Sequence, residues 1–515
     1  MNYLNKQVIV LLAPLSILLS ACTTLGPEYE RPESPLKSDW HSLDNESSTS
    51  ESVNVDEWWE VFNDPVLSEL IHEAYSQNLP LKIAGVRILE ARARLALTRG
   101  QQYPQQQSIN LSSTYSSLSE SRANTQPLDL NYWDYSAGFN ISWEADIWGK
   151  FQRAIQSADA SYLASYARYD DYLVTLIASV AEEYTLIRSL QKQILLANKN
   201  IEFQKKSLSI VTARYNLGAG TELDKKQAET LLYNTQASLP RLNIRLQQRI
   251  NSLSLLLGTT PHHVSEKLSV ENIQIPDSPM SIAAGIPADL LRRRPDVRLA
   301  EHEAIAQSAL IGVAESELYP SFSLFGSLGL VASDNTEFTK SGRDGVGELF
   351  ERDSIEFIGG LGINWNIFNY GRIKNRVRIQ DARFQQSLLQ YQYTVLKAAQ
   401  EVEDSLVAFS QAGAEVEVLS RSVVSSERAA ELALVQFQDG TVEYTRVLDT
   451  QQSLLEQEKL LTLAQTFETR SAITMYRALG GGWGLRENND VVPDNIKMIM
   501  KTRTDWGPIL ENDQN

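Results

Sequence analysis

The sequence is poor in several residues on which catalytic and metal sites depend. Its 515 residues include one cysteine, which excludes an intramolecular disulfide and a zinc site built from several cysteines. The five histidines show no HExxH or other paired spacing typical of a metal site. The glycine-rich Gly480–Gly484 lacks the following Lys-Ser/Thr pair of a phosphate-binding loop. We therefore predict no enzyme activity and no cofactor.

Positive charge and long apolar runs are also scarce. Aspartate plus glutamate number 64 against 47 lysine plus arginine, giving a formal net charge of −17. Nucleic-acid-binding proteins carry a basic surface, so this balance excludes nucleic acid as a partner. Beyond the N-terminus, no segment reaches the roughly 18 apolar residues that a transmembrane helix needs. A membrane crossing by this chain would therefore require β-strands.

The N-terminus has the features of a bacterial signal peptide. Val8–Leu19 is an apolar run too short to span a bilayer of about 30 Å, and it leads into Ser20-Ala21-Cys22. This ending resembles a lipobox, which implies removal of residues 1–21 and acylation of the Cys22 thiol. Thr23 is not the aspartate that tends to hold such lipoproteins at the inner membrane, so we expect an outer-membrane lipid anchor. The alternative is an ordinary signal peptide with an incidental cysteine.

The chain contains an internal duplication. Tyr103-Pro104 recurs as Tyr319-Pro320, 216 positions later, and Trp143 recurs as Trp365, 222 positions later. Such regular offsets would not arise by chance, and their difference indicates a six-residue insertion. The expected organisation is an extended segment that bears the lipid anchor, two repeats and a polar C-terminal tail, at 22–60, 61–270, 271–484 and 485–515.

Each repeat contains one very long predicted helix. No glycine or proline lies between Gly149 and Gly218, and only Gly413 lies between Gly371 and Gly440. Apolar residues in the first of these segments recur every 3.6 residues on average, roughly the period of a straight α-helix. At 1.5 Å per residue each helix would be roughly 100 Å long. The long helices are expected at 150–217 and 372–439, and shorter ones at about 67–101, 221–257, 288–317 and 443–478.

Before each long helix, the spacing between apolar residues changes from about 3.6 residues to two. Apolar residues alternate with small or polar ones in 135–143 and 357–365, and the partner strands are expected at 108–117 and 321–330. Strands of about ten residues with this alternation are typical of transmembrane β-barrels. A soluble hairpin buried on one face is the alternative. Four strands cannot close a barrel, so two copies would share eight strands or three copies twelve.

Together these features resemble the TolC-like outer-membrane efflux proteins, specifically their lipoprotein branch of OprM and NodT type. The resemblance covers nearly the whole mature chain. Its motifs are Cys22 with Gly26-Pro27-Glu28-Tyr29 and Arg31-Pro32, Trp58-Trp59 with Phe62 and Asp64, Arg293-Arg294-Pro295-Asp296-Val297, and Leu479-Gly480-Gly481-Gly482-Trp483. The resemblance implies an α+β membrane protein. In it, a homotrimer forms a twelve-stranded transmembrane β-barrel in the outer membrane, continued into the periplasm by an α-helical barrel.

The resemblance also implies a function. Family members passively conduct drugs or other small molecules that an inner-membrane pump, here of the RND class, delivers through a periplasmic adaptor. Two alternatives stay open: a duct for peptide or protein secretion driven by an ABC transporter, and a non-conducting lipoprotein scaffold. The sequence shows no ladder of methionine or histidine along a helix face, which disfavours export of soft metal ions.

In this family the turns after the two long helices close the periplasmic end and receive the adaptor. The corresponding turns contain Gly218 and Thr221 in the first repeat, and Gly440 and Thr441 in the second. A glycine at this place supplies the left-handed residue that ends a helix and lets the chain reverse. These four residues are the expected adaptor-docking tip.

The resemblance places two carboxylates at the gate. Asp449, nine residues after Gly440, matches a carboxylate that rings the closed aperture, and Asp224 matches one in the latch between helices. Three Asp449 side chains about 6 Å apart would repel by roughly 3 kcal/mol per pair at an effective dielectric near 20. Such a ring binds cations or raises its own pKa values, and it disfavours anions.

Two positions depart from the family's latch. Phe437 and Val442 stand where relatives can carry tyrosine and arginine, so the polar lock of those relatives cannot form. Arg446 stands where some relatives have a second acid. We therefore expect a different latch, made by Arg446 with Asp224 or Glu443.

Overall fold

The computed structural model describes residues 24–32, 55–121, 123, 130–268, 273–278, 288–335, 345–487 and 489–510. Cys22 and the expected signal peptide lie outside these residues. The chain forms two compact units, each drawing on both halves of the duplication. Unit 1 comprises residues 1–32, 90–164 and 301–390, and unit 2 comprises residues 33–89, 165–300 and 391–515.

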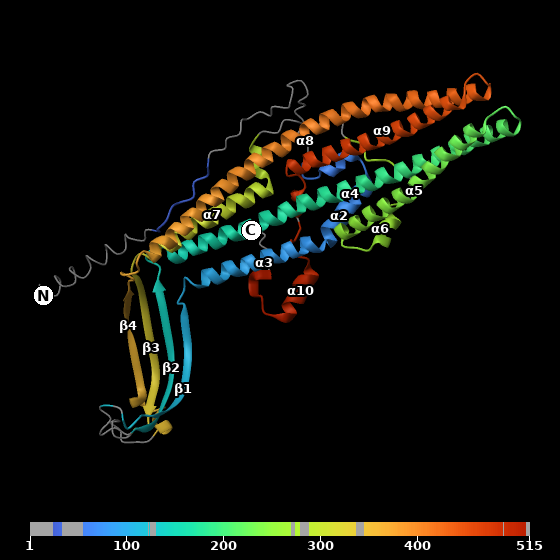
Figure 1. Ribbon diagram of the computed structural model, residues 1–515. Coiled ribbons are helices and arrows are strands. Elements are labelled where there is room, and N and C mark those ends of the chain that lie inside the picture. The colour runs from blue at the N-terminus through green and yellow to red at the C-terminus, as the bar shows by residue number, and fades with distance from the viewer. Residues whose placement is uncertain are drawn as a thin grey trace. The chain divides into compact units, whose positions relative to one another are not determined.

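Unit 1 contains a four-stranded antiparallel sheet. Its strands are β1 (Gln106–Ser117), β2 (Asn131–Ala145), β3 (Ser321–Ser333) and β4 (Ile355–Asn364). They pair in the order β1-β2-β3-β4 and lie side by side in Figure 1. Every strand end lies within four residues of the expected position. Large apolar side chains on the sheet are exposed within the single chain, among them Ile109, Leu111, Phe357, Leu361 and Ile363.

Two helices of equal length follow the strand pairs. They are α4 (Lys150–Asn216) and α8 (Arg372–Gln438), each of 67 residues and each ending one residue before the expected position. Long segments almost free of glycine and proline allow helices of this length, because no residue interrupts the backbone hydrogen bonds. Each helix turns back into a shorter one, α5 (Glu222–Leu257) and α9 (Tyr444–Ala478), as Figure 1 shows.

Proline interrupts two helices that the apolar pattern predicted as continuous. The first is divided into α2 (Pro65–Gln77) and α3 (Leu79–Gly100). Pro80 cannot extend a preceding helix, and Asn78 Oδ1 caps the new one by accepting from the Leu81 N–H at 2.7 Å. The second is divided into a 3₁₀ turn, η2 (Ala288–Arg293), and α7 (Pro295–Ser316), where proline occupies the first helical position.

The core of unit 2 is built around two tryptophans of the 3₁₀ turn η1 (Trp58–Phe62). Both are fully buried, and Trp58 stacks on Tyr476 of α9 with ring centroids 5.3 Å apart. Gly481 leaves space for this ring, since a Cβ there would lie 2.9 Å from Trp58 Cδ1. The segment before the first repeat therefore meets the end of the second repeat in one core.

The C-terminal segment is more structured than its polar composition indicated. It contains α10 (Asp494–Arg503) between two 3₁₀ turns, η5 (Trp483–Arg486) and η6 (Gly507–Leu510). Val492, Met500 and Leu510 are buried against Leu89 of α3. Composition missed this packing because a few apolar residues on one face suffice to attach a short amphipathic helix.

The remaining short elements are α6 (Pro261–Lys267) and the 3₁₀ turns η3 (Gly345–Glu348) and η4 (Arg352–Ser354). Among the described residues, no helix is both long and apolar enough to cross a membrane.

Candidate functional site

The two helix turns have the same backbone geometry. Gly218 and Gly440 adopt left-handed φ values of +75° and +76°. In each turn the residue after the glycine donates its N–H to the carbonyl five residues earlier: Ala219 to Arg214 at 2.8 Å, and Thr441 to Gln436 at 2.9 Å. This is the Schellman pattern, in which the glycine lets the chain reverse without strain. The duplicated sequence thus builds two equivalent tips.

A cation–π contact joins the two turns. The guanidinium carbon of Arg214, in the last turn of α4, lies 4.7 Å from the ring centroid of Phe437 on α8. The same guanidinium donates a hydrogen bond to the Phe437 carbonyl. Phe437 packs edge-to-face against Tyr444, the first residue of α9, with centroids 5.4 Å apart. We call Arg214, Phe437 and Tyr444 the tip latch.

An apolar cluster surrounds the tip latch and excludes water from its aromatic rings. Its buried members are Val211, Ala228, Ala433, Phe437, Tyr444 and Val447. Phe437, for which the sequence predicts no polar lock, presents a ring on which the Arg214 cation stacks. Arg214 was not among the residues predicted from the sequence; the available signal was a basic residue in the last turn of α4, four residues before Gly218.

Within the chain, the expected gate residues lie at the start of α5 and at the start of α9. Asp224 belongs to the N-terminal capping box of α5: its N–H donates to Thr221 Oγ1 at 3.1 Å, and its carboxylate accepts from the Thr221 N–H at 3.2 Å. Arg446, Glu443 and Asp449 are exposed at the start of α9. Within the chain, Arg214 is the cation that contacts both turns, and Asp224 caps the start of α5 through Thr221. A latch made by Arg446 with Asp224 or Glu443 stays a prediction.

Beyond the tip latch, a polar seam joins α4 and α9. Gln204 and Gln451 are buried on these two helices, and their side-chain amide atoms have no hydrogen-bond partner among the described residues. Burial raises the pKa of the Glu458 carboxyl, and burial together with the charge of Asp224 raises that of Tyr444. The hydrogen-bonded pairs of the seam include Ser207–Tyr444, Asn200–Glu458, Lys192–Gln465 and Ser189–Thr466, at 3.3, 2.6, 2.8 and 2.7 Å.

A charged hollow of about 290 Å³ lies in unit 2, where α7 begins. Arg294 is buried there and donates to Asp296 at 2.8 Å, to Glu401 at 2.7 Å and to the Ala478 carbonyl at 2.5 Å. Asp171 lines the same hollow. Burial, the main cause, and the charges of Asp296 and Glu401 raise the pKa of Asp171 to about 6, against the opposing effect of Arg294 and Lys397.

We expect Asp171→Asn to stabilise the protein at neutral pH. The pKa of Asp171 rises from 3.8 to about 6 on folding, so the folded state binds this proton more tightly than the unfolded chain. The contribution of this group to stability is therefore greatest below about pH 4 and is lost as the pH rises through about 6. In chemical unfolding, the free energy of unfolding of the variant should exceed that of wild type by about 3 kcal/mol at pH 8 and by less than about 1 kcal/mol at pH 4. The control is Asp381→Asn, at an exposed carboxylate of α8, which should change the free energy of unfolding at neither pH. An equal gain in stability at both pH values for Asp171→Asn would contradict the expectation.

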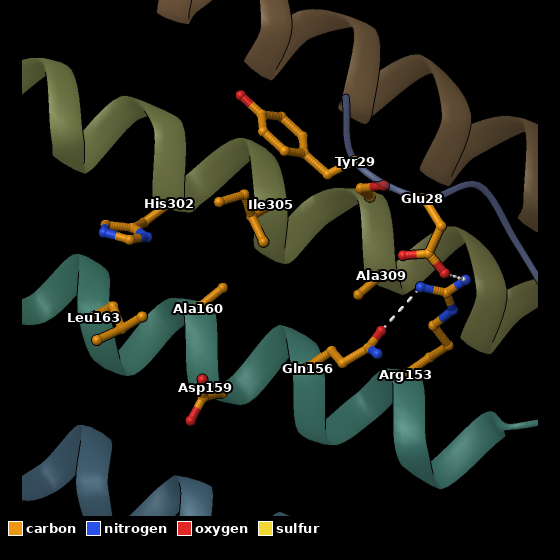
Figure 2. Close-up of a pocket in the computed structure, with 11 residues that line it drawn as sticks. Glu28, Tyr29, Arg153, Gln156, Asp159, Ala160, Leu163, His302, Ile305 and Ala309 are labelled. Atoms are coloured by element: carbon orange, nitrogen blue, oxygen red, sulfur yellow. Dashed lines mark hydrogen bonds and ion pairs between the residues drawn. The ribbon is translucent and has the colours of Figure 1, made fainter. Parts of the chain in front are cut away.

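Residues 24–32, which we call the N-terminal strap, are held in unit 1 by α4 and α7 (Figure 2). The buried Arg153 of α4 donates to the carbonyls of Leu25 and Gly26, at 2.9 and 3.2 Å, and to the Glu28 carboxylate at 2.7 Å. Arg31 pairs with Glu301 of α7 at 2.5 Å. A hollow of about 270 Å³ is bordered by Glu28 and Tyr29 of the strap and by side chains of both helices. The strap thus fixes the chain two residues after the expected lipid attachment at Cys22.

Gly26→Ala should release the strap. Gly26 has a φ of +88°, and a Cβ there would lie 2.5 Å from the Cα of Gly312 on α7. We expect cleavage after Glu28 or Glu30 by a glutamyl endopeptidase to become about tenfold faster or more, as a loss of 1.4 kcal/mol implies. Gly100→Ala is the matched control, since nothing lies within 4 Å of its added Cβ. Equal cleavage rates for the two variants would show that the strap does not depend on this contact.

Most of this chain matches the sequence model of a known protein family. The sequence model of the family described as "Outer membrane efflux protein" matches residues 70–259 and 286–481, which include both tip turns. The chain belongs to the outer membrane efflux protein family. The resemblance drawn from the sequence is therefore confirmed, and the location of this efflux protein is the outer membrane.

Individual relatives match this efflux protein over almost their whole length. The probable outer membrane lipoprotein SilC of Salmonella typhimurium is 29% identical over 471 residues, which cover 90% of this chain and 97% of SilC. The solvent efflux pump outer membrane protein SrpC of Pseudomonas putida is 28% identical over 482 residues, covering 92% and 98%. Among solved structures, the outer-membrane channel OprN superposes with a TM-score of 0.81 at 28% identity, covering 89% of this chain and 99% of OprN. CusC superposes with a TM-score of 0.77 at 26% identity, covering 89% and 100%.

The motifs on which the resemblance was drawn lie at structural junctions. Gly26, Trp58, Arg294 and Gly481 each close a contact between segments distant in sequence. Among the described residues, no group of three or more histidine, cysteine, aspartate or glutamate side chains is placed to hold a metal ion.

Proposed function

We propose that three copies of this chain form one channel in the outer membrane. Their twelve strands would close a β-barrel, the long helices would continue it into the periplasm, and Cys22 would carry the lipid anchor. Small molecules would pass through it passively, delivered by a periplasmic adaptor and an inner-membrane pump of the RND class.

The sheet is the observation that best supports this proposal. Among the residues that the structure describes, the outermost strands β1 and β4 each leave one edge unpaired, while large apolar side chains such as Leu111 and Leu361 are exposed on the sheet. Unpaired strand edges are not tolerated in lipid, and closure into a barrel removes them. A non-conducting scaffold would need neither the apolar surface nor the free edges.

The names of relatives support a small-molecule cargo without selecting one. The toluene efflux pump outer membrane protein TtgI of Pseudomonas putida is 28% identical to this chain, and the cation efflux system protein CusC of Escherichia coli is 27% identical. Proteins with such different cargoes are equally similar to this chain. We therefore assign the choice of substrate to the pump and the adaptor, and conduction to this chain.

The gate would lie at the tip turns. Gly218, Thr221, Gly440 and Thr441 would form the surface that meets the adaptor. Asp449 is exposed near the start of α9. In a trimer three copies of this carboxylate would approach one another, and their mutual repulsion would favour cations in the aperture.

Single-channel conductance of the acylated protein in planar bilayers tests this function. Wild type should give small cation-selective currents, and Asp449→Asn should give larger currents with weaker cation selectivity, because the negative ring loses its charge. Asp439→Asn is the matched control, since this carboxylate is also exposed at the same turn but lies just after the end of α8, before α9 begins.

Each outcome separates the competing functions. The absence of current from wild type and both variants would contradict conduction and favour the scaffold. Equal changes in Asp449→Asn and Asp439→Asn would keep the channel but remove Asp449 from the gate.

A further inference from the structure

A further hollow in unit 2, which we call the leucine hollow, lies between α4, α5 and α9. Its volume is about 550 Å³, within the range of about 300–1,000 Å³ that is typical of small-molecule sites. One half-buried leucine from each helix lines it: Leu196 of α4, Leu242 of α5 and Leu455 of α9. Leu196 lies 20 residues, or about 30 Å, before the end of α4 at Asn216. The leucine hollow therefore has apolar walls and is separate from the tip turns.

Two arginines of α5 border the leucine hollow and have no partner there. Arg241 and Arg245 are about one helical turn apart, so they lie on the same face of α5. Both are exposed, and neither forms a hydrogen bond or an ion pair with any residue that the structure describes. One turn further along α5, Arg249 instead donates to Glu183 at 2.9 Å, and it does not line the hollow. Two positive charges at the hollow are therefore available to a ligand.

The other charged side chains that line the leucine hollow already have partners. Glu456 pairs with Lys459 at 3.3 Å. Glu458 is buried and accepts a hydrogen bond from Asn200 at 2.6 Å. Burial raises the pKa of Glu458, so this group tends less to carry a negative charge than an exposed glutamate does. The uncompensated charges are those of the two arginines, and the hollow therefore favours an anion.

The duplication indicates that the helix itself does not require these arginines. Helix α9 is the counterpart of α5 in the second repeat and begins 222 positions after it. At the positions that correspond to Arg241 and Arg245, α9 carries Leu463 and Phe467, and both are exposed. A return helix of the same repeat thus forms with apolar residues in these places. The arginine pair is a particular feature of the leucine hollow and not of the repeat.

We propose that the leucine hollow binds an amphiphilic anion, namely a carboxylate or sulfonate attached to a small apolar body. The apolar body would contact the three leucines. The anionic group would pair with Arg241 and Arg245, because a guanidinium presents several N–H donors in a plane that fits the oxygens of such groups. This site goes beyond the proposed channel function and does not depend on conduction. Its ligand is opposite in charge to the cations that Asp449 would favour.

Equilibrium dialysis of the full-length acylated protein in uncharged maltoside micelles tests this site. The probe is naphthalene-2-sulfonate, and the matched uncharged probe is 2-naphthalenemethanol. Dialysis of micelles without protein corrects for partition of either probe into the detergent. Wild type should bind the sulfonate at least about tenfold more tightly than the alcohol, because only the anion forms charge-assisted hydrogen bonds with the arginines.

Charge variants identify the groups that hold the anion. Arg241→Gln combined with Arg245→Gln should lower the affinity for the sulfonate at least about tenfold and leave the affinity for the alcohol unchanged. Arg241→Lys combined with Arg245→Lys keeps both charges and should recover part of this loss. Arg249→Gln is the matched control, since Arg249 lies on the same helix outside the hollow, and it should leave both affinities at the wild-type values.

A filling variant tests the leucine hollow without a change in charge. Ala237 is exposed on α5 and lines the hollow, so the indole of Ala237→Trp would occupy the space that the ligand needs. This variant should lower the affinity for both probes. Gln236→Trp is the matched control, because Gln236 is exposed on the same helix and does not line the hollow. The helical circular dichroism of each variant should match that of wild type.

Each contrary outcome would overturn the proposal. Equal affinity of wild type for the two probes, or unchanged sulfonate affinity in the double glutamine variant, would show that the arginines do not hold an anion. Unchanged binding in Ala237→Trp would show that the probe binds outside the leucine hollow. Absence of sulfonate binding by wild type would likewise overturn the site, and it is the result expected if another copy of the chain covered the hollow.

Discussion

Replacing Arg486 with alanine is expected to lower the free energy of unfolding of unit 2 by about 3 kcal/mol or more. The side chain of Asp170 on α4 is fully buried, and Arg486 of η5 donates to its two oxygens at 2.5 and 3.1 Å. Arg298 is the second cation near this carboxylate, but its nearest nitrogen lies 3.5 Å away and its side chain is partly exposed. Loss of Arg486 therefore leaves a buried charge with a poor partner.

Chemical unfolding followed by helical circular dichroism measures this effect. The matched control is Arg477→Ala, which removes an arginine from a half-exposed pair with Glu182 at 4.0 Å and should cost less than about 1 kcal/mol. The double variant Asp170→Leu with Arg486→Met should recover most of the loss, since apolar residues can replace a buried ion pair. If Arg486→Ala were no more destabilising than Arg477→Ala, the buried pair would not be the contact that fastens the C-terminal segment.

Arg214→Ala is expected to open the tip. A cation–π contact contributes about 0.5–2 kcal/mol, and a hydrogen bond from a charged group about 1.5–3 kcal/mol. Arg214 is half-buried, so we take the lower part of this range, about 2 kcal/mol, which corresponds to a shift of roughly 30-fold from closed to open states. The measurement is the open probability of the acylated protein in single-channel records.

Two variants sharpen this test of the tip latch. Lys206→Ala removes an exposed cation from the same helix and should leave the open probability unchanged. Phe437→Leu keeps an apolar side chain in the cluster but removes the ring under the guanidinium, so it should open the tip less than Arg214→Ala does. Unchanged gating in Arg214→Ala, together with altered currents in Asp449→Asn, would mean that the closed state is held by other contacts.

Local patterns were sufficient to predict the elements of the fold. The glycine-free segment 150–217 and the alternation of 135–143 correspond to α4 and β2, because helix length and strand faces depend on neighbouring residues in the sequence. The break at Asn78 was missed although Pro80 is visible in the sequence, since the apolar pattern continues across it. A local backbone restriction there overrides the hydrophobic period.

The tip latch could not be predicted in this way. Arg214 and Phe437 are 223 residues apart, and nothing near either residue in the sequence indicates the other. Position relative to Gly218 and Gly440 directed attention to Asp224 and Arg446, but the requirement to cap α5 had already engaged Asp224 with Thr221. The duplication was the one long-range signal in the sequence, and it relates corresponding residues without saying which of them touch.

The polar seam between α4 and α9 affects how easily these helices can separate. Hydrogen bonds such as Asn200–Glu458 exchange for bonds to water at a net cost of only about 1 kcal/mol each. Gln204 and Gln451 would gain hydration on exposure, because their amide groups are unpaired while buried. The resistance to separation is therefore unevenly distributed along the helix pair. Near the tip it lies in the apolar cluster, and the polar stretch behind this cluster, which water can hydrate, can follow once the cluster opens.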